Sequence, residues 1–192
     1  KHALDVASPV LGKLLQPACE RMLQSGDTSR AMAAAVAVDC LNVEGLGALL
    51  AEALTNRLSD ADFVTATVNV LARKAQAHPA SFKAVLQQDK LGAQASMTAL
   101  AALASIDPAS AKSFAGPVAG KLSPMAHAAL AHRLTESAAG AKLLLDLLDD
   151  GNIAKSVVDR ALAERIGSKA KNDKRAKALL QRQHAARAAQ VK

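Results

Sequence analysis

Residues 59–79, SDADFVTATVNVLARKAQAHP, indicate the fold most directly. Ser59 and Asp60 are residue types that begin helices, because their side chains accept hydrogen bonds from the free N–H groups of the first turn. Apolar residues then recur at the spacing of one helix face: Phe63, Val64, Val68 and Leu71. The segment therefore predicts an amphipathic helix that ends near His78, because the residue before a proline disfavours helix.

The same arrangement of a cap followed by an apolar stripe recurs along the chain. Further starts are predicted at the cap cluster of residues 26–29 (GDTS), after Asp107 with its following proline, and after Ser123 with its following proline. Pro17 should kink or split the first helix, because proline lacks the N–H that a helix interior needs. About ten short helices joined by short turns are expected.

A repeat is visible among these helices. Met32, Val64 and Met97 occupy similar places in three of them, 32 and 33 residues apart. A repeat of about 30–35 residues with two helices is typical of a helical solenoid, in which each unit buries its apolar face only against its neighbours. We expect these three residues to be buried in the second helix of each pair. A compact irregular bundle with accidental periodicity is the alternative.

The predicted fold is thus all-α, a right-handed α-α superhelix of HEAT-like repeats over residues 1–168, followed by a basic C-terminal helix or linker over residues 169–192. Composition agrees with an all-helical chain. About a quarter of the residues are Ala, Trp and Tyr are absent, and 51% of the chain is hydrophobic. These values exclude a disordered chain and disfavour a β-sandwich or barrel. No run of 18 apolar residues predicts a transmembrane helix. Because the chain begins at Lys1, without a signal-peptide pattern, we expect a processed protein or an excised fragment.

Positive charge is concentrated at the C-terminal end. From Lys155 onward there are 11 basic and three acidic residues, whereas residues 1–154 have 13 basic and 14 acidic ones. The candidate partner-docking segment comprises Lys169, Lys171, Lys174, Arg175, Lys177 and Arg182. Three interpretations stay open: a solvated terminal helix, a surface that docks an acidic partner, and a nucleic-acid contact.

No catalytic, cofactor-binding or metal-ligating residue is predicted. His127 and His132 are five residues apart, whereas helical metal pairs are three or four apart. Asp146, Asp149 and Asp150 lack the alternating ligands of a calcium loop, and we interpret them as a polar helix end. The three phenylalanines fall in apolar stripes and are expected in the core: Phe63, Phe82 and Phe114.

The two cysteines, Cys19 and Cys40, fall on successive predicted helices. They are interpreted as two small buried residues. A disulfide between those helices is the alternative, and it requires an oxidising compartment. Neither cysteine begins a C-x-x-C motif.

One stretch carries a resemblance. Residues 134–166, LTESAAGAKLLLDLLDDGNIAKSVVDRALAERI, have a small-residue turn at 137–140, a Leu-rich helix at 143–148, a glycine turn at 151–153, and then a short helix with Val157, Val158 and Leu162. This element resembles one in the HEAT-like middle of the planctomycete-type haem-binding, membrane-associated dehydrogenase family. The resemblance implies an extracytoplasmic location and no haem role for this chain, because the haem-attachment motif is missing. Without the resemblance, a cytoplasmic location is expected.

The functional hypothesis is a non-catalytic helical-repeat scaffold or protein-interaction module. Its partner would be another protein or neighbouring domains of a parent chain, and no small-molecule substrate is indicated. The alternative is a HEAT-like nucleic-acid-binding protein similar to the alkylation-repair DNA glycosylases. The net charge of +7 favours that alternative. The nearly neutral body and the lack of Trp and Tyr for base stacking count against it.

Overall fold

Polar caps and prolines begin several helices of the computed structural model, as the sequence predicts. The structure describes residues 2–41, 43, 45–73 and 78–190, with side chains omitted for 2–9 and 183–190. Asp27 accepts hydrogen bonds from the N–H groups of Ser29 and Arg30, at 2.9 and 3.2 Å. Ser123 accepts one from Ala126 at 3.3 Å, immediately before a proline at the first helical position. The described residues form 11 α-helices and one 3₁₀ helix, without a strand.

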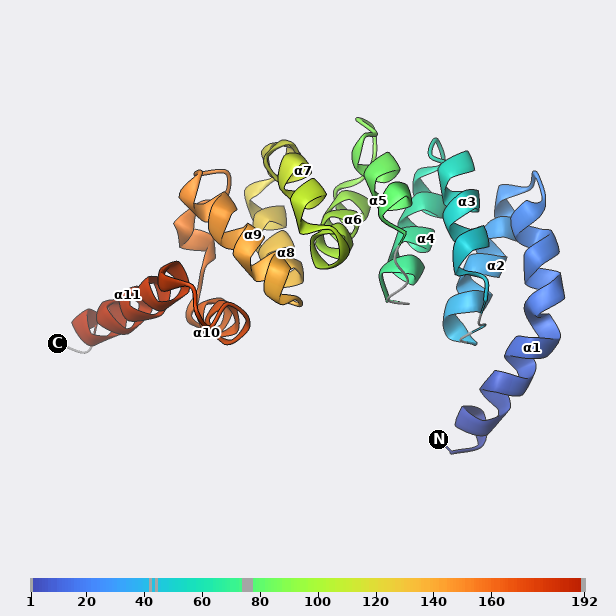
Figure 1. Ribbon diagram of the computed structural model, residues 1–192, viewed down its shortest axis with the longest axis horizontal. Helices are drawn as coiled ribbons and strands as arrows, with labels where there is room; N and C mark the ends of the chain where they lie inside the picture. The colour runs from blue at the N-terminus through green and yellow to red at the C-terminus, as the bar shows by residue number, and fades with distance from the viewer. Residues whose placement is uncertain (1, 42, 44, 74–77, 191–192) are drawn as a thin grey trace. The chain divides into compact units, whose positions relative to one another are not determined.

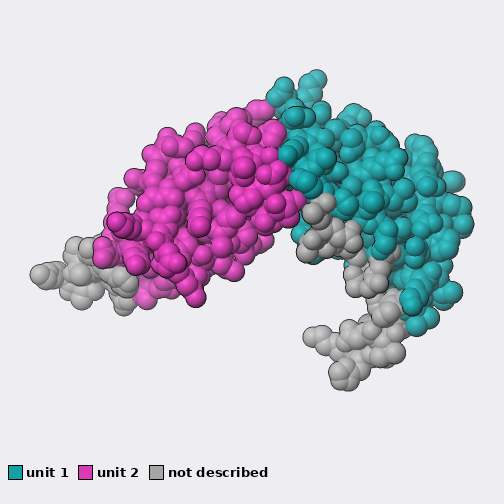
Figure 2. Space-filling view, viewed as in Figure 1, with its two compact units in different colours: residues 1–99 teal, residues 100–192 magenta. Residues whose placement is uncertain are grey.

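The chain divides into two compact units, residues 1–99 and 100–192 (Figure 2). The first contains α1 (His2–Gln24), α2 (Thr28–Cys40), α3 (Gly47–Asn56), α4 (Ala61–Arg73), α5 (Pro79–Leu86) and the first half of α6 (Ala93–Ile106). Here α1 packs against α2 and α3, α2 and α3 both pack against α4, and α3 also packs against α5 (Figure 1). Helices α1 and α3 therefore each contact the next helix and the one after it, whereas α2 contacts α1 and α4.

The second unit continues α6 and adds α7 (Pro108–Lys121), α8 (Pro124–Leu134), α9 (Ala138–Asp149), the 3₁₀ helix η1 (Lys155–Val157), α10 (Arg160–Lys169) and α11 (Lys174–Gln190). Helix α9 packs against α7, α8 and α10, and α11 packs against α10. The predicted domain limit after residue 168 stays a prediction. Among the described residues, no helix has both the length and the apolar character that a membrane span requires.

The predicted stripes of α4 and α9 are confirmed as core. Phe63, Val64 and Val68 are fully buried, and Leu71 is 1% exposed. The four leucines of the α9 stripe, 143, 144, 147 and 148, are all at most 6% exposed. Helix α4 carries its large apolar side chains on one side, so the pattern identifies its buried side. Helix α9 also buries Leu145, which the predicted stripe omits.

In α2 the predicted burial of Met32 is wrong. Ala31, Ala34, Ala35 and Val38 are fully buried, whereas Met32 is only partly buried and Val36 is 49% exposed. Alanine occupies both sides of this helix, so hydrophobic periodicity alone does not distinguish them. Met97 and Val64 are buried as predicted, at 5% and 0% exposure.

Other details also differ from the sequence predictions. Helix α1 continues through Pro17, which therefore does not split it. Phe114 is half-buried, unlike the two other phenylalanines, which lie in the core. Both cysteines are free: Cys19 is buried as predicted, but Cys40 is exposed. The predicted end of α4 near His78 involves residues 74–77, which lie outside the described residues.

The turns of residues 134–166 have clear physical causes. Ser137 caps α9 by accepting a hydrogen bond from the N–H of Gly140 at 2.9 Å. At Gly140 a side chain has no room, because a Cβ atom would lie 2.2 Å from the carbonyl oxygen of Leu134. Gly151 adopts a positive φ of 74°, which favours glycine. The predicted short helix after this turn is divided: Val157 ends η1, and α10 begins only at residue 160.

Candidate functional site

Arg175, one of the six basic candidates, lies within a cluster of carboxylates. Its Nη1 donates to Asp146 Oδ1 at 2.7 Å and to Asp149 Oδ2 at 3.2 Å, and its Nη2 donates to Asp173 Oδ2 at 2.8 Å. The hydrogen bonds from Arg175 lower the pKa of Asp173 to about 2. Burial would raise the pKa of Asp146, but hydrogen bonds from Arg175 and Lys112 outweigh it, so that this pKa is lowered.

Two lysines complete this cluster. Lys112 Nζ lies 3.1 Å from Asp146 Oδ2, and Lys155 Nζ lies 4.0 Å from Asp149 Oδ1. Three carboxylates are thus matched by three cations, and the Arg175 cluster (these two lysines, Arg175, Asp146, Asp149 and Asp173) has no formal net charge. It connects α7, α9, η1 and α11 within the second unit. We therefore infer a structural role for Arg175 within the second unit.

The packing of α11 on α10 explains the orientation of the basic residues. Ala176 is 1% exposed, and a Cβ atom at Gly167 of α10 would lie 2.6 Å from Leu180 Cδ1. A glycine at this position therefore lets the two helices approach closely. Lys174 and Arg182 fall on the half of α11 away from Ala176 and Leu180, and Lys177 lies on its flank, by the 100° that each helical residue advances.

The remaining five candidates form a basic surface, which we define as Lys169, Lys171, Lys174, Lys177 and Arg182. All five are exposed. None forms an ion pair with another described residue. Lys169 ends α10, Lys171 lies in the turn, and the other three lie on α11. This surface therefore presents five positive charges to solvent, beside a cluster whose own charges cancel.

The ion pairs between Arg175 and the acidic end of α9 were not predicted from the sequence. Carboxylates at a helix C-terminus are unfavourable to the helix dipole unless a cation compensates them. The acidic end of α9 was therefore the feature of the sequence that could have predicted these ion pairs, because a basic segment follows within 30 residues. Asp150, the third residue of the acidic trio, is exposed and lies outside the Arg175 cluster.

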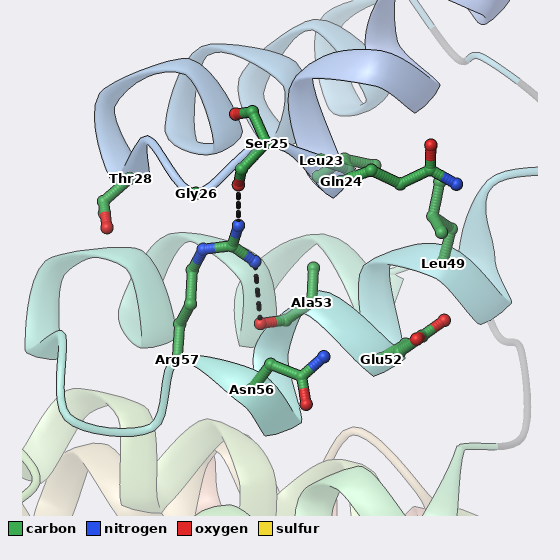
Figure 3. Close-up of a pocket in the computed structure, with 10 residues that line it drawn as sticks. All are labelled: Leu23, Gln24, Ser25, Gly26, Thr28, Leu49, Glu52, Ala53, Asn56 and Arg57. Atoms are coloured by element: carbon green, nitrogen blue, oxygen red, sulfur yellow. Dashed lines mark hydrogen bonds between the residues drawn. The ribbon is translucent and has the colours of Figure 1, made fainter.

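The first unit contains a hollow of about 410 Å³ between the end of α1, the α1–α2 turn and one face of α3 (Figure 3). It is lined by Leu23, Gln24, Ser25, Gly26, Thr28, Leu49, Glu52, Ala53, Asn56 and Arg57. Leu23 and Ala53 are buried, whereas the polar side chains of Gln24, Glu52 and Asn56 are exposed. The hollow therefore combines an apolar base with a polar rim.

Arg57 closes one side of this hollow. Its guanidinium donates to the carbonyl oxygen of Ser25, and to that of Ala53 at 3.5 Å (Figure 3). The same group lies over the ring of Phe63, with 5.5 Å from Cζ to the ring centroid. Arg57 thus joins the α1–α2 turn to α3 and α4, and two of its five N–H donors are directed at carbonyl oxygens.

Other chemistry is limited in the part of the chain that the structure describes. No group of His, Cys, Asp and Glu there is arranged to hold a metal ion. His127 Nε2 lies 2.9 Å from the carbonyl oxygen of Ala119, so that this histidine contacts the end of the preceding helix.

Comparison of the chain with family models, with curated proteins and with solved structures finds no match.

Proposed function

We propose that this chain is a non-catalytic protein-interaction module that docks an acidic protein through its basic surface. The observation that carries this proposal is the contrast between Arg175 and its neighbours. Arg175 is neutralised by carboxylates of its own unit, whereas five nearby cations are exposed and have no described ion-pair partner. Unpaired charges of one sign raise the encounter rate with an opposite charge and select against partners of like charge.

Helical repeats of the HEAT-like kind are part of the proposal. In the first unit α1, α3 and α5 follow one another through direct contacts, while α2 and α4 form a second row that contacts them. This order supports a short two-layer stack, in which each helix pair is covered by the next. The basic surface itself lies in the second unit, where α10 packs against α9 and α11 packs against α10. Exposed side chains on packed helices favour docking without a large loss of conformational entropy.

The test is a titration with a fluorescein-labelled peptide rich in Asp and Glu, followed by fluorescence anisotropy. Reversing three charges of the basic surface, Lys169→Glu, Lys174→Glu and Lys177→Glu, should reduce affinity at least about tenfold. The matched control reverses three exposed charges of the first unit: Lys13→Glu, Arg21→Glu and Lys90→Glu. It changes net charge equally and should change affinity little.

Two results would contradict the proposal. One is equal loss of affinity in both triple variants, which would indicate a response to net charge alone. The other is preference for duplex DNA of equal charge over the acidic peptide, with the steep salt dependence of phosphate contacts. That second result would instead favour the nucleic-acid hypothesis.

A further inference from the structure

Large apolar side chains are exposed along one face of α1, and we define them as the α1 stripe: Val10, Leu11, Leu14 and Leu15. Their exposed fractions range from 38 to 70%. They stand at positions i, i+1, i+4 and i+5, which is the spacing of one helix face. The other exposed large apolar side chains of the described residues lie singly, one on α2 and one on α8. The α1 stripe is therefore a continuous apolar surface in contact with water.

A second face of α1 is already used within the first unit. Cys19 and Leu23 are buried, and a Cβ atom at Gly12 would lie 3.4 Å from the carbonyl oxygen of Leu41. By the advance of about 100° per residue, these positions lie at least about 140° around the helix from Leu14. Helix α1 thus has one apolar face packed within its unit, where it contacts α2 and α3, and another that is open.

The open face lies at the start of a row of helices (Figure 1). In the row α1, α3 and α5, helix α3 has a row member on each side, whereas α1 has one on the side of α3. The end helix of a stack normally presents a polar outer face to water. Residues 174–182 of α11 follow this rule, because they expose charged side chains and no large apolar one. The α1 stripe breaks the rule, and α11 offers it no apolar surface for a head-to-tail contact between copies.

We propose that the α1 stripe pairs with the α1 stripe of a second copy of this chain, in antiparallel orientation about Leu14. The face matches itself when it is reversed about that residue. Val10 stands four positions before Leu14, and the half-buried Ala18 stands four positions after it. Each large Val10 therefore meets the small Ala18 of the second copy, and the two Leu14 side chains meet at the symmetry axis. One patch serves both partners, as in the twofold pairs that are the commonest oligomers.

Charge does not oppose this pairing. The α1 stripe has no charged residue, and Lys13 lies about 100° around the helix from Leu14, in the direction away from Leu15. Arg21 stands seven positions after Leu14, so the two copies of Arg21 are about 21 Å apart along the antiparallel pair. That separation exceeds the Debye length of about 8 Å at physiological salt. An uncharged apolar face is thus what the α1 stripe requires, and a second copy supplies one.

The dimer should be weak and therefore dependent on concentration. One helix face offers fewer residues than the roughly 20–30 a side of a standard interface. We expect a Kd on the order of 10–100 µM. The test is sedimentation equilibrium of the full chain from about 1 µM to about 1 mM, a range that spans this Kd. The average mass should rise from 19.8 kDa toward twice that value.

Substitutions at the symmetry axis locate the contact. Leu14→Glu should raise the Kd at least about tenfold, because two carboxylates then meet at the axis. Met125→Glu is the matched control: Met125 is 87% exposed on α8 of the second unit, so the same charge is added away from the α1 stripe. An equimolar mixture of Leu14→Glu and Leu14→Lys should pair again, because opposite charges then meet. Circular dichroism of each variant reports whether it folds.

Four outcomes would overturn this proposal. They are a monomer at about 1 mM, which is at least about ten times the expected Kd, equal effects of Leu14→Glu and Met125→Glu, a mixture of the two Leu14 variants that pairs no better than either alone, and a monomeric chain that uses Leu14 to bind vesicles of phosphatidylserine and phosphatidylcholine. The last outcome would assign the α1 stripe to a lipid surface. Failure here leaves the proposed function intact, because the acidic peptide is read out through the basic surface of the second unit.

Discussion

The turn between α8 and α9 offers a stability prediction, tested by Gly140→Ala. An ideal Cβ atom at Gly140 would lie 2.2 Å from the carbonyl oxygen of Leu134 and 2.9 Å from Ser137 Oγ. A side-chain oxygen can rotate away, but the backbone oxygen of Leu134 cannot. The turn must therefore open by more than 1 Å to reach an ordinary van der Waals contact, which begins near 3.4 Å.

The magnitude follows from three contributions. Overpacking of this kind costs about 1–3 kcal/mol. Weakening the Ser137 cap adds about 1 kcal/mol, because its hydrogen bond goes to the displaced N–H of Gly140. The gain in helix propensity from glycine to alanine returns about 0.5–1 kcal/mol. We expect a net loss of about 1–3.5 kcal/mol, and each kcal/mol lowers the Tm of a unit of this size by about 4–8 °C.

The assay is thermal and urea unfolding followed by circular dichroism at the helical band. Gly120→Ala is the matched control, because Gly120 also lies in a helix but a Cβ atom there meets nothing within 4 Å. That variant should be neutral or about 0.5–1 kcal/mol more stable. The reasoning is refuted if Gly140→Ala is as stable as the parent chain, or if both variants lose the same stability.

Three further predictions concern charge and thiols. Arg175→Ala should lower the free energy of unfolding by about 1 kcal/mol at low salt and by less at high salt, because its ion pairs are partly exposed. Lys174→Ala should change the free energy of unfolding little. Equal effects of the two substitutions would contradict the structural role of Arg175. The pKa of Asp173 is about 2 in the folded chain and about 3.9 in the unfolded chain, so the stability that Asp173 contributes is complete above about pH 4 and is lost as the pH falls toward 2. Asp173→Asn should make the unfolding midpoint less dependent on pH over this range. An unchanged pH dependence in this variant would contradict the prediction. Burial raises the pKa of the Cys19 thiol, whereas Cys40 is exposed. Iodoacetamide should therefore modify Cys40 in the native chain and Cys19 only after unfolding. Mass spectrometry that finds both cysteines modified in the native chain would disprove this prediction.

The all-helical fold class and several helix starts could be predicted from the sequence, because they depend on residues close together in the chain. Asp27 and Ser123 cap their helices through contacts with residues two or three positions away. Burial in α4 was predictable too, because Phe63 and its neighbours contrast with polar residues on the other side. In α2 this contrast is missing, and the contacts with α1 and α4, rather than the local pattern, decide which alanines are buried.

The candidate sites depended on contacts that are distant in the sequence. Arg175 lies 29 residues from Asp146, and nothing in its local sequence distinguishes it from Lys174 or Lys177. The hollow likewise combines residues 23–28 with residues 49–57, and no motif joins them. The concentration of basic residues near the C-terminal end could be predicted from the sequence. Which of these residues form ion pairs with carboxylates of the same unit could not.

The fully buried alanines of α2 have a consequence for mutagenesis. Ala31, Ala34 and Ala35 have no side-chain volume to remove, so alanine scanning would pass over them without a signal. Enlargement is the informative change at such sites, because adding methyl groups forces neighbouring backbones apart. A scan of this protein by valine or leucine would therefore reveal interhelical contacts that conventional truncation leaves unseen.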